Sequence, residues 1–285
     1  MTRILHVAAI AALAPVVALA DVVAIVANKD NTLIEDPQGD LSLGAAYNFY
    51  VGRTGSNAGG TRRRGVVRFD VASAVPAGST IVSVTLKLRM TQTNSGSQTI
   101  LLKRMLADWG EAGSFGFGGG GVLALPGDAT WLHQFYSNDP WDTPGGVFSA
   151  TASASKSVGG QAFYTWGSTA GMVGDVQSWL NSPATNFGWL VQGNEAQLNT
   201  AKKFESREST LPEYRPLLTI TFTPPPTCVD ADINCDGVVD GADLGLLLGV
   251  WGTGNADGDL DHSGTVDGAD LGLLLGAWTA VAAVE

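Results

Sequence analysis

Alternating hydrophobic and polar residues recur along the chain before residue 224. Every second residue from Val82 to Met90 is apolar, and the same alternation recurs at Leu218, Ile220 and Phe222. Because successive side chains of a strand point to opposite faces of a sheet, this pattern predicts strands with one buried face. Shorter apolar segments predict further strands at 22–26, 49–52, 66–70, 99–104 and 187–192. Many short strands separated by turn residues predict a mainly β fold, an antiparallel β-sandwich.

One helix interrupts this pattern. Val173, Val176, Trp179 and Leu180 fall on one stripe at helical spacing, which predicts a short helix over 171–180.

The first 20 residues have a different pattern. One arginine precedes a short apolar run that ends in Ala18-Leu19-Ala20, which is typical of a secretory signal peptide cleaved before Asp21. An uncleaved membrane anchor is the alternative, but the run contains Pro15 and is short for a membrane span. We therefore expect a secreted, extracellular or cell-surface protein without a membrane span after cleavage.

Several short segments of residues 21–223 follow one another in a recognisable order. They are Phe49-Tyr50-Val51-Gly52, RRGVVRFD at 63–70, DWGE at 108–111, ATW at 129–131, WDTPGG at 141–146, VQSWL at 176–180, NFGW at 186–189 and RPL at 215–217. This set resembles the DNRLRE-type carbohydrate-binding modules of secreted bacterial proteins. The resemblance implies a β-sandwich of jelly-roll type and a polysaccharide ligand.

Aromatic residues between 131 and 141 are candidates for carbohydrate binding. Flat rings pack against pyranose faces, so we select Trp131, Tyr136 and Trp141. Core packing is the alternative, and it fits Trp131 and Trp141 equally well because the family pattern includes them. The arginines at 62–64 could pair with an acidic polysaccharide, or could lie in a solvated loop.

Catalytic chemistry has few candidate residues. Of three histidines, His6 lies in the signal peptide and His262 in the acidic C-terminal region, which leaves His133 for a Ser–His–Asp or zinc site. Glycoside cleavage needs only two carboxyl groups, so a polysaccharide-degrading lyase or glycoside hydrolase stays an alternative. We favour a non-catalytic protein.

Charge divides the chain into two regions. The 285 residues carry a net charge of −11, and residues 228–285 alone hold 11 acidic and no basic residues. Such a charge argues against nucleic acid as a partner. The prolines at 224–226 predict a stiff linker over 224–227. An acidic module is expected over 228–280, followed by a tail at 281–285.

The acidic module contains a duplication. Residues 239–251 and 266–278 match at 12 of 13 positions, and each copy overlaps the end of an acidic stretch of twelve residues, 232–243 or 259–270. Oxygen-bearing side chains occupy positions 1, 3, 5, 9 and 12, with glycine at position 6, which is the EF-hand loop pattern. We expect two Ca²⁺ ions, held by Asp232, Asn234, Asp236, the Val238 carbonyl, Asp240 and Asp243, and by Asp259, Asp261, Ser263, the Thr265 carbonyl, Asp267 and Asp270.

The alternative is a solvated acidic tail. Asp243 and Asp270 should each open a helix that carries leucines and a tryptophan, and Val239 and Val266 should pair the two loops. Cys228 and Cys235 are close enough for one local disulfide, which the sequence leaves open.

Duplicated loops with this spacing resemble the type I dockerin over essentially the whole acidic module. The resemblance implies docking onto a cohesin-like or other surface protein. It also implies that positions 10 and 11, here Gly241, Ala242, Gly268 and Ala269, contribute to recognition. The expected protein is thus a glycan-binding sandwich with a calcium-dependent docking module; a structural surface protein without sugar binding is the other alternative.

Overall fold

The computed structural model describes residues 20–225 and 228–279. Residues 1–19 of the predicted signal peptide, residues 226–227 of the predicted linker and the predicted tail at 281–285 lie outside the described residues. The chain forms two compact units that divide between Pro224 and Pro225. Nowhere in the described ranges is a helix both long enough and apolar enough to cross a membrane.

The first unit is mainly β, as the alternation predicts. Eleven strands join in one sheet in which every pairing is antiparallel. They are β1 (Asp21–Val26), β2 (Lys29–Ile34), β4 (Asn48–Arg53), β5 (Arg62–Arg68), β6 (Thr80–Thr93), β7 (Gln98–Arg104), β11 (Ala154–Val158), β12 (Ala162–Trp166), β13 (Trp189–Gln192), β14 (Lys202–Glu205) and β15 (Leu217–Thr223). Two small ribbons, β3 (Leu41–Ser42) with β8 (Val122–Leu123) and β9 (His133–Phe135) with β10 (Asp139–Pro140), accompany it.

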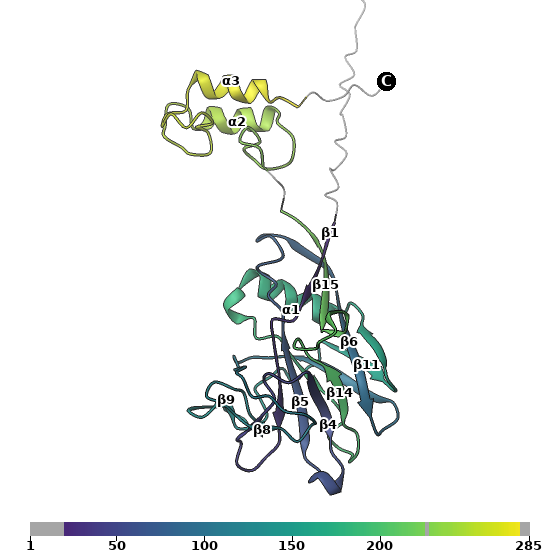
Figure 1. Ribbon diagram of the computed structural model, residues 1–285. Helices are drawn as coiled ribbons and strands as arrows, with labels where there is room; N and C mark the ends of the chain where they lie inside the picture. Colours follow the sequence, from purple (N-terminus) through teal and green to yellow (C-terminus); the bar gives the residue numbers. More distant parts are fainter. Residues whose placement is uncertain (1–19, 226–227, 280–285) are drawn as a thin grey trace, which may run out of the picture. The chain divides into compact units, whose positions relative to one another are not determined.

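The large sheet curls so that its two halves share one core (Figure 1). Leu86 from β6 and Val191 from β13 belong to the same cluster of buried residues. Helix α1 (Ala170–Asn181) begins where Thr169 accepts a hydrogen bond from the Met172 amide, and it packs against this core through residues such as Trp179. The helix predicted over 171–180 is therefore confirmed. Three short 3₁₀ turns, at Ser56–Ala58, Pro183–Thr185 and Pro212–Tyr214, lie in connections.

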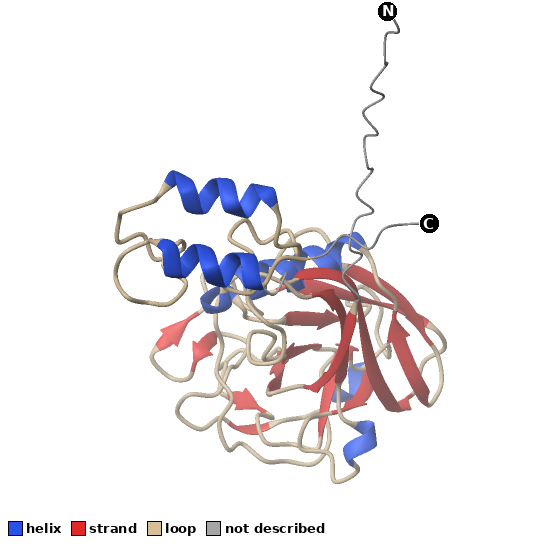
Figure 2. Cartoon of the chain, turned by 90° about the horizontal axis from the view of Figure 1, so that it is seen from above, coloured by secondary structure: helices blue, strands red, loops and turns tan. Residues whose placement is uncertain are grey.

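The second unit contains two helices of identical sequence, α2 (Gly241–Gly249) and α3 (Gly268–Gly276), which lie side by side in Figures 1 and 2. Leu247 of α2 and Leu274 of α3 are fully buried in a small core with Val239 and Val266. Cys228 and Cys235 form a disulfide, which answers the question that the sequence leaves open. This covalent closure and the small core hold the two acidic loops, 232–243 and 259–270, next to the helices.

Candidate functional site

Three carboxylates converge in the second acidic loop. Ligand oxygens of Asp259, Asp261 and Asp270 all lie within 4.8 Å of one another. These residues are positions 1, 3 and 12 of the loop. Asp270 is fully buried and Asp259 is only 8% exposed, so two of the three carboxylates are withdrawn from bulk water.

The loop coils around the carboxylate of Asp259. Its Oδ1 accepts a hydrogen bond from the Ser263 amide at 2.9 Å, and its Oδ2 accepts one from the Gly264 amide at 2.7 Å. Gly264 has a φ of +92°, a conformation that favours glycine. Ser263 donates its hydroxyl to the carbonyl of Thr265 at 3.3 Å. Position 6 therefore needs glycine because the chain must turn sharply here.

Asp270 connects the loop to helix α3. Its carboxylate accepts hydrogen bonds from the amides of Asp267 at 2.7 Å and Asp261 at 3.1 Å. Asp267 in turn caps the helix by accepting a bond from the Ala269 amide at 2.8 Å. Hydrogen bonds from backbone amides lower the pKa of Asp270, and the bond from the Asp267 amide has the largest effect. This buried carboxyl group is therefore ionised.

The first loop repeats this arrangement. Asp232 accepts hydrogen bonds from the amides of Asp236 at 3.1 Å and Gly237 at 2.9 Å. Asp243, also fully buried, accepts bonds from the amides of Asn234 at 3.1 Å and Asp240 at 2.9 Å. The recurrence of the same bonds at equivalent positions means that the fold of each loop follows from its twelve residues.

The two loops differ at two of their side-chain ligand positions, position 3 and position 5, where Asp236 of the first loop stands for Ser263 of the second. Position 3 is Asn234, whose amide nitrogen donates to Asp236 at 3.0 Å while its oxygen accepts from the Asp236 backbone amide at 2.9 Å. Asp240 caps α2 through the Ala242 amide at 2.7 Å, and the Val238 amide donates to Asp236 at 2.9 Å. The first loop thus offers an amide oxygen at position 3 and a carboxylate at position 5, whereas the second offers a carboxylate at position 3 and a hydroxyl at position 5.

These residues suit a hard divalent cation. Calcium prefers carboxylate, amide and carbonyl oxygens, and both loops offer such a set. Residues 228–285 contain no lysine or arginine that could balance the charge from within the unit. Buried carboxylates without a neighbouring cation are costly, so a Ca²⁺ ion fits this donor set.

The sequence predicts that Val239 and Val266 pair the two loops, but the backbone hydrogen bonds follow a different pattern. Val239 and Val266 share the same core, but their backbones do not pair with each other. Val266 exchanges backbone bonds with the segment after α2, to Gly252 at 2.9 Å and Thr253 at 2.8 Å. Val239 accepts a bond from the Thr279 amide, after α3, at 3.0 Å. Each loop is therefore hydrogen-bonded to the segment that follows the other loop's helix.

The helices of the second unit carry two sets of exposed residues. The predicted recognition residues Gly241, Ala242, Gly268 and Ala269 are all exposed at the first turns of α2 and α3. Both helices and the residues just after them also expose large apolar side chains at equivalent positions, namely Leu246, Leu248 and Trp251, and Leu273, Leu275 and Trp278. Leu246 and Leu248 flank the buried Leu247, and Leu273 and Leu275 flank the buried Leu274, so each helix is apolar on both sides of its buried stripe. Exposed apolar side chains of this size are candidates for contact with another protein.

The aromatic residues selected for carbohydrate binding lie largely in the interior. Trp131 and Trp141 are 4% and 5% exposed and belong to a buried cluster with Trp109. The guanidinium groups of Arg62 and Arg64 lie 4.9 and 4.7 Å from the ring centroid of Trp131. The Trp141 indole donates to the Thr130 carbonyl at 3.0 Å.

Tyr136 is half-buried against His133, with ring centroids 5.4 Å apart. Of the selected aromatic residues, the two tryptophans thus offer almost no ring surface to a sugar, since their neighbours in the core occupy it.

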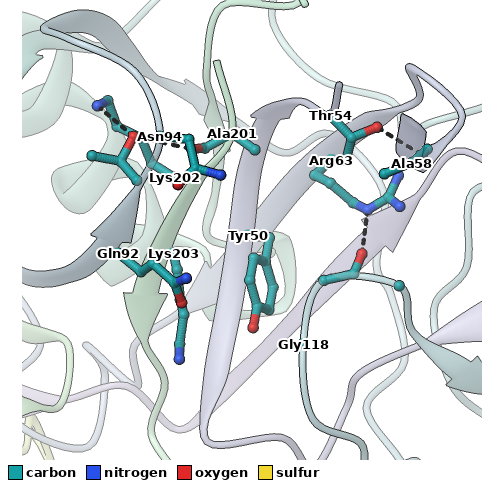
Figure 3. Close-up of a pocket in the computed structure, with 13 residues that line it drawn as sticks. Tyr50, Thr54, Ala58, Arg63, Gln92, Asn94, Gly118, Ala201, Lys202 and Lys203 are labelled. Carbon is teal, nitrogen blue, oxygen red and sulfur yellow. Dashed lines mark hydrogen bonds between the residues drawn. The ribbon is translucent and has the colours of Figure 1, made fainter. Parts of the chain in front are cut away.

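A different hollow lies on the sheet. Tyr50 of β4, Lys203 of β14 and Gln92 of β6 are neighbours in the strand register, and they line a pocket of about 560 Å³ (Figure 3). Arg63 and the glycines at 118–120 line it beside Tyr50. This volume falls within the range of small-molecule sites. Sequence reasoning missed this pocket because four separate segments build it.

An exposed aromatic row begins next to this pocket. Phe117, which precedes Gly118, is 86% exposed, and its ring centroid lies 5.1 Å from that of Phe115. Phe115 in turn lies 5.2 Å from Tyr47. We call Tyr47, Phe115 and Phe117 the aromatic row. The sequence indicated this aromatic row only through two phenylalanines that alternate with glycine in a loop.

The first unit also contains a cluster of three carboxylates. Ligand oxygens of Asp30, Glu111 and Glu208 lie within 4.8 Å of one another. The Arg207 amide donates to Asp30 at 2.6 Å and its guanidinium to Glu111 at 2.9 Å. Burial raises the pKa of Asp30 well above its usual range, and burial with the nearby Glu111 charge raises that of Glu208 to about 7. This carboxylate cluster joins β2 to the segment after β14.

Comparison with known proteins adds no family assignment: no family model matches the chain, and no curated protein matches it.

Proposed function

We propose that the protein is a non-catalytic, extracellular glycan-binding protein that attaches to a protein partner through a calcium-dependent docking unit. The first unit is a β-sandwich of jelly-roll type and a member of the DNRLRE-type modules, and the second is a dockerin-like unit with two EF-hand-like loops. The observation that carries this proposal is the hydrogen-bond pattern that both loops repeat around Asp232 and Asp259. In each loop, backbone amides bond to this aspartate and draw the chain around it, so that oxygen atoms suited to a metal ion lie close together.

Each loop would hold one Ca²⁺ ion. The side chains of Asp232, Asn234, Asp236 and Asp243 with the Val238 carbonyl would hold the first, and those of Asp259, Asp261, Ser263 and Asp270 with the Thr265 carbonyl the second. Asp240 and Asp267 cap the helices, and at position 9 they would act through water. A bound Ca²⁺ ion supplies the positive charge that the buried carboxylates lack.

Docking would use the exposed apolar side chains of α2 and α3 together with the first turns of both helices. The two helices have the same sequence, and each loop is hydrogen-bonded to the segment that follows the other loop's helix. These features support a pseudo-twofold surface, on which a cohesin-like partner binds in either of two orientations.

Calcium titration of the full chain by isothermal titration calorimetry tests the docking half of the proposal. Asp270→Asn removes one charge from a buried position 12 and should lower the affinity of one site by at least about tenfold. Asp257→Asn makes the same change at an exposed residue outside the loops and should leave both sites unchanged. Equal effects of the two substitutions would contradict the proposed ligand set.

The glycan half is tested by affinity electrophoresis of the full chain in gels that contain a polysaccharide. Phe117→Ala should reduce the retardation, because it removes the most exposed ring of the aromatic row. Leu123→Ala, at a residue that is 71% exposed, is the control. Release of reducing or unsaturated ends from alginate, xylan or pectin by the chain would favour the enzyme alternative instead.

A further inference from the structure

The pocket beside Tyr50 has an unusual charge balance, which suggests what it binds. Its thirteen lining residues include Arg63, Lys202 and Lys203 and no aspartate or glutamate. The whole chain, by contrast, has a net charge of −11. We call this hollow the cationic pocket.

Arg63 differs from the arginines on either side of it. Arg62 pairs with Glu35, and Arg64 pairs with Glu195 at 2.7 Å. Arg63 donates only to neutral oxygens, the Gly119 carbonyl at 2.6 Å and the Thr61 hydroxyl at 2.7 Å among them. No ion pair of Arg63 is found with any described residue, although it is only 5% exposed.

Lys202 contributes a second positive charge that forms no ion pair with any described residue. Its side chain is fully buried, and its ammonium group donates to the carbonyls of Gly96 at 3.0 Å and Gly159 at 3.1 Å and to the hydroxyls of Thr93 and Ser95. All of these acceptors are neutral. Burial accordingly lowers the pKa of Lys202.

Lys203 is the most accessible of the three cations that line the pocket. It is half-buried on the opposite face of β14 from Lys202, directly across from Tyr50 in the register with β4. Among the described residues it forms no ion pair. Glu205, on the same face of β14, is the nearest acid along the strand, and it lies outside the pocket lining.

Electrostatics favours an anion in such a pocket. Glu35 and Asp36 act on Arg63, and Glu205 acts on Tyr50, only from outside the lining. Positive charges in a hollow whose lining holds no acidic residue raise the local potential, and low-dielectric walls strengthen it. A neutral sugar would leave Arg63 and Lys203 uncompensated. A sugar that carries a carboxylate or sulfate would pair with them while its ring contacts the Tyr50 ring, which Figure 3 places between Lys203 and Arg63.

We propose that the cationic pocket binds an anionic glycan, with Lys203 and Arg63 pairing with its acidic groups and Tyr50 contacting a sugar ring. This inference rests on the proposed glycan-binding function and narrows it to one chemical class. Gln92, next to Lys203 in the register with β6, is placed to bond sugar hydroxyls.

The test uses the full chain with three polymers in isothermal titration calorimetry: polygalacturonate for carboxylates, dextran sulfate for sulfates and dextran as a neutral glycan. We expect binding to at least one polyanion, weakening as salt is added, and none to dextran. The polyanion that binds more tightly identifies the acidic group. Lys203→Gln should lower that affinity about tenfold, whereas Lys156→Gln, at an exposed lysine of β11, should leave it unchanged.

Three results would overturn the inference, and they separate it from the proposed function. Binding to dextran alone contradicts the anionic class but keeps glycan binding. Equal losses in Lys203→Gln and Lys156→Gln contradict the site. An absence of binding to every polymer contradicts both the inference and the proposed glycan binding.

Discussion

Glu208 titrates within the physiological pH range. Its folded pKa of about 7 lies above the ordinary value of 4.5 because burial and the Glu111 charge both disfavour ionisation. Between these pH values the folded state holds a proton that the unfolded chain has released. The contribution of Glu208 to stability is therefore complete below pH 4.5 and is lost as the pH rises toward 7.

Glu208→Gln should flatten this pH dependence, because the amide does not titrate. Between pH 5 and pH 7.5, we expect the wild-type free energy of unfolding to fall by about 1–2 kcal/mol more than that of the variant. Urea unfolding at both pH values measures it. Glu213→Gln, at an exposed glutamate, is the control, and identical pH profiles for all three proteins would refute the assignment.

Single residues also show where a sequence pattern misleads. Trp131 and Trp141 were selected because aromatic rings bind sugars, but both lie in the core. The exposed Phe117 lies in a glycine-rich loop without periodicity. A list of aromatic residues does not reveal which side of the fold each one faces, so exposure had to come from the structure.

Strand β2 illustrates how buried polar residues build an element. Asn31 is fully buried, and its amide nitrogen donates to the carbonyls of Gly110 at 3.2 Å and Ala129 at 3.4 Å. Its oxygen accepts from Thr32, Ser42 and Leu43. This one side chain therefore joins β2 to three other segments of the chain.

Asn31→Asp should destabilise the first unit by about 2–4 kcal/mol, because a carboxylate would face the two carbonyls without a hydrogen to donate. Urea unfolding of the full chain gives the value. Asn28→Asp, at an exposed position, should cost less than about 0.5 kcal/mol. A similar cost at both positions would show that the bonds of Asn31 do not stabilise β2.

The strands divide into those that a sequence predicts and those that it does not. β6 and β15 alternate clearly because one face of each is buried and the other is not. β2 was missed because both of its faces are buried and its buried residues include Asp30, Asn31 and Thr32, whose polarity conceals burial. β14 was missed because Lys202 is buried beside loop carbonyls that lie far away in the sequence.

The two candidate sites differ in the same way. The position of the acidic loops and the start of the helix after each could be predicted, because each loop forms within twelve consecutive positions. The cationic pocket could not, because strand register brings Tyr50, Gln92 and Lys203 together.

The whole molecule consists of two units with different sources of stability. The first contains a large core and no disulfide, whereas the second has a core cluster of six fully or almost fully buried residues, a disulfide and two acidic loops. A core of that size gives little stability on its own, so ion binding should supply part of the folding free energy of the second unit.

Chelation should therefore unfold the second unit alone. In excess EGTA, far-UV circular dichroism should lose the helical contribution of α2 and α3, while thermal unfolding of the first unit stays unchanged. The double variant Asp243→Asn, Asp270→Asn should show the same spectrum without EGTA. Full helix content in excess EGTA would contradict the dependence of this unit on calcium.

Native mass spectrometry of the chelator-treated chain after calcium is restored tests most directly whether the acidic loops are ion sites. The account predicts two Ca²⁺ ions on each wild-type chain, and one on each Asp270→Asn chain at calcium concentrations that fill the intact site. A wild-type chain that binds no calcium under these conditions would contradict it.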